Sequence, residues 1–282
     1  MNRIDARFAK LRQSRRAGLI PYITAGHPNP DWTVSIMHAL VESGADLIEL
    51  GVPFSDVMAD GPVIQHACAR ALEQGMTWQQ VLAMVAEFRR RDPHTPVVLM
   101  GYMNPMERRG MEAAVGESAR AGVDGLLIVD CPVEESAEPL ALLAGNDMHQ
   151  ICLAAPTTRP ARLERLASVA GGFIYMVSLK GVTGSAALDI DSLAGPIGRI
   201  RELTDCPIAV GFGIREAAQA AAVAGIADGV VIGSALVSVL DECKNLPDAV
   251  AAVRQFVEPI RKAMDNNREL PSTPGRPAVG ET

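Results

Sequence analysis

The sequence predicts one α/β domain, an eight-stranded parallel TIM (β/α)8 barrel with an extra N-terminal helix. Eight short apolar runs alternate with segments of helical periodicity, which is the pattern of a parallel sheet covered by helices. The length of 282 residues suits a single barrel, which typically takes roughly 250 residues. Aromatic residues make up only 4% of the chain, and small aliphatic residues fit a sheet that is buried on both faces.

The first segment, Met1–Arg16, is rich in basic residues and carries Ile4, Phe8 and Leu11 at helical spacing. A basic, amphipathic start resembles a transit peptide. Asp5 interrupts the basic pattern, however, and no cleavage signal follows. We therefore expect a short amphipathic helix that packs on the barrel.

The expected strands are apolar runs bounded by turn residues. They are Leu19–Thr24, Asp46–Leu50, Pro96–Met100, Gly125–Val129, Met148–Leu153, Gly172–Val177, Pro207–Val210 and Gly229–Ile232. Helical periodicity marks the segments between them, among which are Trp32–Glu42, Trp78–Arg90, Met111–Ala121, Glu134–Leu143, Arg159–Ala167 and Glu216–Val223.

A short element recurs where helices lead into strands. Ser43–Asp46, Ala121–Asp124 and Ala224–Asp228 each contain a glycine suited to a helix C-cap and end on an aspartate. This repetition favours a closed barrel. A doubly wound open sheet stays possible, but its candidate dinucleotide turn, Gly211–Gly213, lacks the third glycine of that motif.

The domain is expected to span residues 1–264. After Met264 the sequence becomes polar and rich in proline and glycine, a composition that cannot bury a core. Residues 265–282 are therefore expected to form a disordered tail.

Composition excludes several classes of protein. The chain has 26 basic and 33 acidic residues, and a net charge of −7 does not suit nucleic-acid binding. The longest apolar run, Ala221–Leu240, is interrupted by Asp228, so we expect no transmembrane segment. The five cysteines are widely spaced and odd in number, which favours a reducing cytoplasm over a disulfide framework. The five histidines are scattered, so no metal site is expected.

Two carboxylates stand where barrels place active sites, at a strand's carboxyl end and in the loop that follows. Glu49 lies near the end of the second strand, and burial there would raise its pKa into the range of a general acid. A salt bridge to a neighbouring strand is the alternative. Asp60 ends the same loop before Gly61 and Pro62, so it could instead cap the next helix.

Two turns of small residues indicate a phosphate site. Gly211–Gly213 follows the seventh strand and Gly233–Ala235 follows the eighth, where barrels commonly hold phosphate with backbone N–H groups and a helix N-terminus. Tight turns without a ligand would also use glycine. The loop Gly181–Ser185 after the sixth strand has the composition either of a lid or of an ordinary surface loop.

Taken together, these segments resemble the tryptophan synthase α-subunit family, from the N-terminal helix to about Met264. The similar motifs are Glu49–Asp56 with Ala59–Pro62, Gly181–Gly184, Gly211–Ile214, Gly233–Ala235, Tyr22–Gly26 and Ala155–Thr158. The resemblance implies retro-aldol cleavage of indole-3-glycerol phosphate into indole and D-glyceraldehyde 3-phosphate, in L-tryptophan biosynthesis. It also implies that this chain needs no cofactor.

The resemblance assigns a role to each group of residues. Glu49 would protonate C3 of the indole ring, and Asp60 would bind the indole N–H and stabilise positive charge on the ring. The expected indole-binding side chains are Tyr22, Met100, Tyr102, Val129, Leu153, Tyr175 and Phe212. The expected phosphate-binding residues are Gly184, Gly213, Gly233 and Ser234, with Thr183 in the lid.

The family's partner is a β subunit that carries pyridoxal phosphate and receives indole, usually in an α₂β₂ tetramer. Val57, Met58, Leu179 and Lys180 depart from the residues common in the family. These departures lie in the two loops expected to move and to touch the partner. Met100 also replaces a frequent leucine, but its thioether can still pack against a ring.

Three other functions compete with this interpretation. Lys180, just past the sixth strand, could form a Schiff base as in covalent aldolases. The barrel could bind a phosphorylated ligand without catalysis and regulate a partner. It could also be a sugar-phosphate isomerase, although the apolar set around Tyr22, Met100 and Tyr175 favours a hydrophobic ring.

Overall fold

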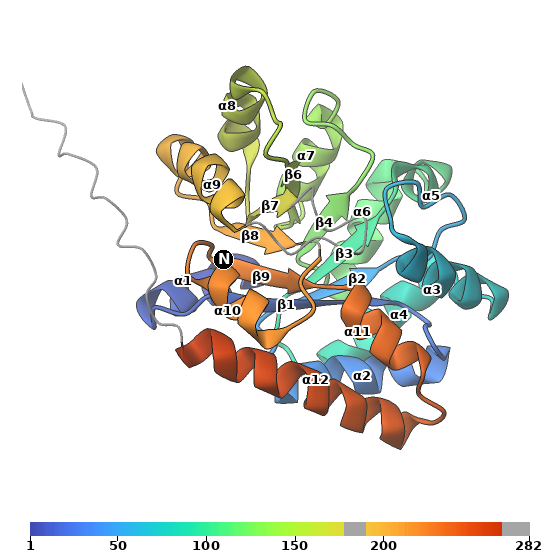
Figure 1. The fold of residues 1–282 in the computed structure, drawn as a ribbon. Helices are drawn as coiled ribbons and strands as arrows, with labels where there is room; N and C mark the ends of the chain where they lie inside the picture. The colour runs from blue at the N-terminus through green and yellow to red at the C-terminus, as the bar shows by residue number, and fades with distance from the viewer. Residues whose placement is uncertain (178–189, 212, 267–282) are drawn as a thin grey trace, which may run out of the picture.

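The computed structural model describes residues 1–177, 190–211 and 213–266 and shows a ring of parallel strands surrounded by helices (Figure 1). The strands are β1 Gly18–Thr24, β2 Ile48–Gly51, β3 Val97–Gly101, β4 Gly125–Ile128, β5 His149–Gln150, β6 Cys152–Ala154, β7 Ile174–Val177, β8 Ile208–Gly211 and β9 Gly229–Ile232. Several predictions fall outside the described residues: Leu179, Lys180, the loop Gly181–Ser185 with Thr183 and Gly184, Phe212, and residues 267–282 of the tail.

One or two of the described helices connect each pair of successive strands except β5 and β6. The helices are α1 Arg3–Gln13, α2 Thr33–Glu42, α3 Pro62–Glu73, α4 Trp78–Arg89, α5 Met103–Arg109, α6 Met111–Ala121, α7 Ala137–Ala144, α8 Pro160–Val169, α9 Asp191–Leu203, α10 Ala217–Ala224, α11 Ser234–Asp241 and α12 Leu246–Asn266, with the 3₁₀ turn η1 Pro30–Trp32 before α2. The expected helices are present, with ends that move by up to a turn.

The strands confirm the predicted barrel. All strand pairings among the described residues are parallel, and the order runs β5-β4-β3-β2-β1-β9-β8-β7-β6. β5 and β6 are two pieces of one strand position, separated by Ile151, whose N–H donates to the carbonyl of Leu126 at 2.8 Å. Since β5 pairs with β4 and β6 with β7, this position joins the two ends of the sheet.

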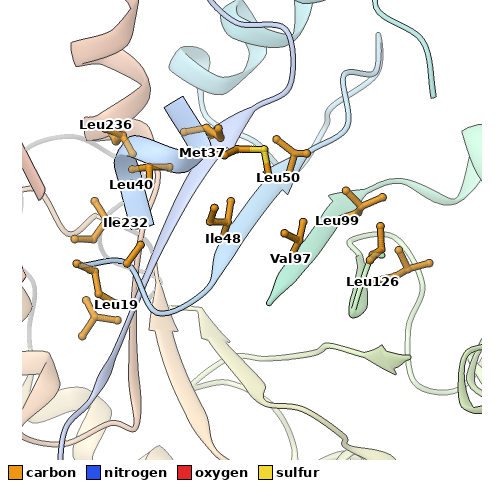
Figure 2. Packing of buried hydrophobic residues seen from close by; sticks show 14 of the residues in the cluster. Leu19, Met37, Leu40, Ile48, Leu50, Val97, Leu99, Leu126, Ile232 and Leu236 are labelled. Carbon is orange, nitrogen blue, oxygen red and sulfur yellow. The ribbon is translucent and has the colours of Figure 1, made fainter. Parts of the chain in front are cut away.

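The buried side chains divide into two sets because successive strand residues point to opposite faces. The outward set packs between the strands and the helices, and includes Leu19, Ile48, Leu50, Val97 and Leu99. Figure 2 shows these side chains together with Met37 and Leu40 of α2. The inward set fills the barrel and leaves its carboxyl-end layer to the residues of the candidate site.

α1 closes the amino end of the barrel, which confirms the predicted N-terminal helix. Ile4, Phe8 and Leu11 are buried in the same cluster as the inward strand residues. Leu11 and Phe8 lie against Gly18, the first residue of β1, and Ile4 lies against Gly125, the first residue of β4. The start of the chain is therefore part of the core.

The recurring aspartate before a strand has a structural role. Asp46 accepts a hydrogen bond from the N–H of Leu19, Asp124 from that of Val97, and Asp228 from that of Ile208. In each case the acceptor precedes one strand and the donor stands at the start of its neighbour. Each carboxylate also meets an arginine: Arg261 and Arg7, Arg3 and Arg89, and Arg201, respectively. These contacts fasten adjacent strands at their amino ends.

The last helix extends past the predicted domain boundary. α12 runs to Asn266, so residues 265 and 266 are helical and do not belong to the expected disordered tail. The physical reason is an ion-pair network in which Asp265 accepts hydrogen bonds from Arg16 and Arg261. Polar composition predicted a loop, but these partners hold the final turn. Within the described residues, no helix has the length and apolar character needed to cross a membrane.

Candidate functional site

Glu49 lies inside the barrel at the carboxyl end of β2, in register with Tyr22 of β1. Its side chain is fully buried, with a residue exposure of 1%. Its Oε1 atom has no hydrogen-bond partner among the described residues, and none of the ion pairs found there includes it. The alternative of a structural salt bridge therefore has no support in the described structure.

Burial raises the pKa of Glu49 to about 8, with the nearby charge of Asp60 adding to the effect. The cause is desolvation: a carboxylate without donors or cations loses its hydration and gains little in return. At neutral pH the side chain is therefore largely protonated. An unpartnered acid in this state can donate its proton to a bound substrate.

Asp60 is also buried, with an exposure of 8%, and has one strong partner. The Tyr102 hydroxyl donates to its Oδ2 at 2.8 Å and accepts from the N–H of Ala59 at 3.2 Å. Burial raises the pKa of Asp60, while the Tyr102 hydrogen bond opposes that change. Helix α3 begins with Gly61 as its N-cap and has no side-chain capping bond, so the capping alternative for Asp60 is wrong.

The two carboxylates share one end of the barrel. The charge of Asp60 raises the pKa of Glu49, which requires the two groups to be near each other. The packing agrees: Tyr22, in register with Glu49, and Tyr102, hydrogen bonded to Asp60, both pack with Ile64 of α3. The structure therefore brings both predicted catalytic residues to the mouth of the barrel.

Most of the expected indole-binding side chains line this mouth. Tyr22 and Met100 share a cluster with residues of α3 and α11, and Tyr102 and Val129 share another with α3. Leu153 is in register with Tyr175 on the neighbouring strand. Met100, Val129 and Leu153 are only partly buried, so the apolar wall has an open surface. Phe212 lies outside the described residues.

Two glycines that the sequence interpretation did not assign make room for the tyrosine rings. A Cβ atom added to Gly51 would lie 2.1 Å from the hydroxyl of Tyr22, and one added to Gly211 would lie 2.2 Å from that of Tyr175. Each tyrosine ring therefore lies over a glycine at the end of the neighbouring strand and occupies the space where a side chain would be. The available sequence signal was a glycine at the last position of two strands that border a tyrosine-bearing strand.

The expected phosphate residues that are described meet the same end of the barrel. Gly233 is the N-cap of α11 and Ser234 is its first residue. Gly213 follows β8 with φ +80°. The side chain of Tyr22 lies beside Gly233, which connects this helix start to the pocket wall. Exposed N–H groups and the helix dipole at such a start favour an anion.

The described residues contain no group of three or more His, Cys, Asp or Glu side chains placed to hold a metal ion.

Two residues of the loop between Glu49 and Asp60 depart from the family's common residues, and their surroundings differ. Val57 is buried in the cluster of Tyr102, whereas Met58 is 83% exposed. Met58 can therefore meet a partner or solvent without disturbing the carboxylates.

Comparisons with known proteins agree with this geometry. The family model for the tryptophan synthase alpha chain matches residues 8–265. A tryptophan synthase alpha chain of Marinobacter nauticus is 51% identical over 267 residues, covering 94% of this chain and 99% of the relative. One of Thioalkalivibrio sulfidiphilus is 54% identical over 266 residues, covering 94% and 100%.

Solved structures give the same result. The tryptophan synthase alpha chain of Legionella pneumophila superposes with a TM-score of 0.87 at 41% identity, over 94% of this chain and 98% of that one. A chain of Mycobacterium tuberculosis tryptophan synthase superposes with a TM-score of 0.84 at 36% identity, over 93% and 98%. These similarities extend over nearly the whole barrel.

Proposed function

The chain belongs to the tryptophan synthase alpha chain family, and from this membership we propose how its residues carry out the family's reaction. The family's activity is a carbon–carbon lyase reaction that cleaves indole-3-glycerol phosphate in tryptophan biosynthesis. The observation that supports our proposal most strongly is the environment of Glu49. It is a fully buried acid without a hydrogen-bond partner on Oε1, with a pKa of about 8, beside Asp60.

Glu49 acts first as an acid and then as a base. Its proton goes to C3 of the indole ring, which leaves a positive charge on the ring nitrogen. The resulting Glu49 carboxylate takes the proton of the hydroxyl on the adjacent glycerol carbon. The bond between C3 and that carbon breaks, its electron pair restores the neutral indole, and the carbon becomes the aldehyde of glyceraldehyde 3-phosphate. Glu49 ends the cycle protonated, as it began.

Asp60 stabilises the charge that appears between these two proton transfers. Its carboxylate accepts the indole N–H, so the positive ring nitrogen faces a negative group in a buried site. The Tyr102 hydrogen bond supports this role because it favours the ionised form of Asp60. Proton transfer and hydrogen bonding by the chain's own residues complete the proposed cycle, which thus has no step for a cofactor.

Substrate binding divides between an apolar group of side chains and a polar group at the start of α11 and after β8. Tyr22, Met100, Val129, Leu153 and Tyr175 offer apolar surface to the indole ring. Gly213, Gly233 and Ser234 offer backbone N–H groups and a hydroxyl to the phosphate, and Gly184 is proposed to join them. The substrate would then span from Asp60 to the start of α11.

The decisive experiment measures indole release by the isolated chain and by its Glu49→Gln variant. Loss of a general acid should lower kcat by roughly 10² to 10⁴-fold. The wild-type rate should fall as the pH rises through about 8, because Glu49 then loses its proton. Glu112→Gln, on the exposed face of α6, is the matched control and should keep the wild-type rate. An unchanged rate in Glu49→Gln would refute the assignment.

Family membership also brings association with a tryptophan synthase β subunit. We propose that the complex is an α₂β₂ tetramer and that pyridoxal phosphate resides only in the β subunit. We further propose a cytoplasmic location, because the five cysteines are free, as a reducing compartment would keep them. The mass of the complex in analytical ultracentrifugation tests the stoichiometry, and a value other than that of two copies of each chain would reject it.

A further inference from the structure

Outside the candidate site, side chains from two separate segments, Arg70 and His27, meet at the carboxylate of Asp241. Asp241 is the last residue of α11 and forms an ion pair with Arg70 of α3. His27, in the loop after β1, places its Nε2 atom 3.5 Å from the Oδ1 of Asp241. The His27 side chain is 1% exposed, whereas those of Arg70 and Asp241 are 39% and 37% exposed. None of the three belongs to the proposed chemistry.

The two helices joined by this ion pair each begin at the candidate site. α3 starts directly after Asp60 and Gly61, and α11 starts at Ser234. They pack side by side, with Ala67 of α3 and Val237 of α11 in one cluster around Tyr22 (Figure 1). The apolar side chains of the two helices interdigitate, so packing alone resists sliding along the helix axes at this contact. A charged pair near the far ends also restricts such sliding.

The loop after β1 is also bound to the end of α3. The Gln74 amide, just past the end of α3, donates to the carbonyl of Pro28 at 3.1 Å and to that of Arg70 at 3.2 Å. Both ring nitrogens of His27 are buried without a hydrogen-bond partner among the described residues. The buried His27 ring therefore takes the place of water at the position next to the Asp241 Oδ1 atom.

We propose that Asp241 is a positioning residue that, through Arg70 and His27, fixes the spacing between the start of α3 and the start of α11. This inference rests on the proposed function, in which the indole N–H binds Asp60 and the phosphate binds at Ser234. A substrate held at both ends needs a fixed distance between its two anchors, because misplacement of either one weakens simultaneous engagement. Ligands that occupy only one anchor do not need that distance.

Asp241→Asn tests the proposal by comparing a two-ended ligand with its halves. We expect the KM for indole-3-glycerol phosphate to rise roughly three- to fivefold, with a much smaller change in kcat, because the partly exposed pair is screened by water. The Kd for the same substrate, measured in a Glu49→Gln background where turnover is suppressed, should rise equally. The inhibition constants of free indole and of glycerol 3-phosphate should stay at wild-type values. Asp241→Glu should recover part of the affinity, because it restores the charge.

Several controls separate this role from a general loss of stability. Glu242→Gln removes the same charge from the next residue, which is exposed, and should behave as wild type. Arg70→Gln should reproduce the effect of Asp241→Asn, and the double variant should be little worse than either one, as expected for two halves of one contact. Thermal unfolding of every variant shows whether the domain remains folded at the assay temperature.

Two outcomes would overturn the inference. One is an unchanged KM in Asp241→Asn, and the other is an equal loss of affinity for the whole substrate and for both halves. Ser234→Ala distinguishes failure of the inference from failure of the proposed phosphate site. If Ser234→Ala weakens glycerol 3-phosphate while Asp241→Asn leaves the KM unchanged, only the positioning role is wrong. If Ser234→Ala leaves glycerol 3-phosphate binding intact, the Ser234 hydroxyl is not the phosphate anchor, and the inference falls with that anchor.

Discussion

Glu49 and Asp60 are both buried, yet their surroundings prepare them for different tasks. Glu49 has no partner on its Oε1 atom, and burial together with the charge of Asp60 raises its pKa to about 8. Asp60 accepts a hydrogen bond from Tyr102, which favours its ionised form against the effect of burial. The carboxyl group of Glu49 is thus kept protonated, and the ionised form of Asp60 is stabilised. This division is a common way to place an acid and an electrostatic stabiliser in one site.

Tyr102→Phe should reveal how much of this difference depends on one hydroxyl. A hydrogen bond to a charged group contributes about 1.5–3 kcal/mol, so kcat/KM should fall by roughly 10 to 100-fold. Burial already raises the pKa of Asp60, and losing the donor raises it further. Because the ionised form of Asp60 is the active one, the acid limb of the pH–rate profile should move to higher pH.

The matched control for this variant is Tyr22→Phe, which removes a hydroxyl that bonds to Thr24 at 3.2 Å and not to Asp60. Its acid limb should remain at the wild-type position. Steady-state kinetics across the pH range measures both variants. If the acid limb of Tyr102→Phe coincided with that of the wild type, Tyr102 would not set the ionisation of Asp60.

At the residue scale, the sequence predicted where a catalytic side chain lies in the barrel better than it predicted which groups surround that side chain. The position of Glu49 near the carboxyl end of the second strand predicted that its side chain belongs to the active site, because barrels place their active sites at that end. It could not exclude a salt bridge, since the partner would come from another strand. The space for Tyr22 over Gly51 likewise depends on a ring from the neighbouring strand, so local sequence contained only half of the contact.

At the scale of elements, the aspartates before β2, β4 and β9 stabilise the start of each neighbouring strand. Their burial differs, however. Asp124 is 2% exposed at its side chain and pairs with Arg89, which is 10% exposed, at 2.7 Å. Asp228 is 32% exposed and lies 3.6 Å from Arg201. The same motif should therefore contribute different amounts to the free energy of unfolding.

Asp124→Asn should lower the free energy of unfolding by about 3 kcal/mol, because it leaves the buried charge of Arg89 without its counterion. Asp228→Asn should cost about 1 kcal/mol or less, since water and salt screen the exposed pair. Urea unfolding followed by circular dichroism measures both values. Equal losses in the two variants would show that burial does not determine the strength of this contact.

The sequence predicted the recurring motif but assigned it only to helix ends, through its glycine. The aspartate's acceptor role needs the neighbouring strand, which is far away in the chain: Leu19 for Asp46 and Val97 for Asp124. The end of α12 was misplaced for a related reason, because Asp265 is held by Arg16 from the opposite end of the chain. The break at Ile151 has no sequence signal, since this residue is buried and hydrogen bonded like its neighbours.

At the scale of the whole molecule, stability and chemistry occupy opposite ends of the barrel. α1 seals the amino end with Ile4, Phe8 and Leu11, while the carboxylates lie at the carboxyl ends of the strands. This separation is usual for the fold, in which the bottom face stabilises the domain and the loops of the top face carry the activity. Substitutions in α1 should therefore change the free energy of unfolding far more than the rate of catalysis.

Phe8→Ala provides the test at this scale. Phe8 is 5% exposed, and its ring centroid lies 5.8 Å from that of Phe173 on the chain entering β7. Replacing a buried phenylalanine by alanine typically costs about 3–5 kcal/mol, because the transfer energy is lost and a cavity remains. The whole domain should unfold in one transition at a lower temperature, since α1 shares the barrel's interior cluster. At temperatures well below that transition, kcat and KM for indole-3-glycerol phosphate should match the wild type.

Calorimetry measures the unfolding of Phe8→Ala, and indole release measures its kcat and KM, with Lys10→Ala on the exposed face of α1 as the control. A large fall in kcat while the domain remains folded would show that the amino end of the barrel acts on the catalytic layer.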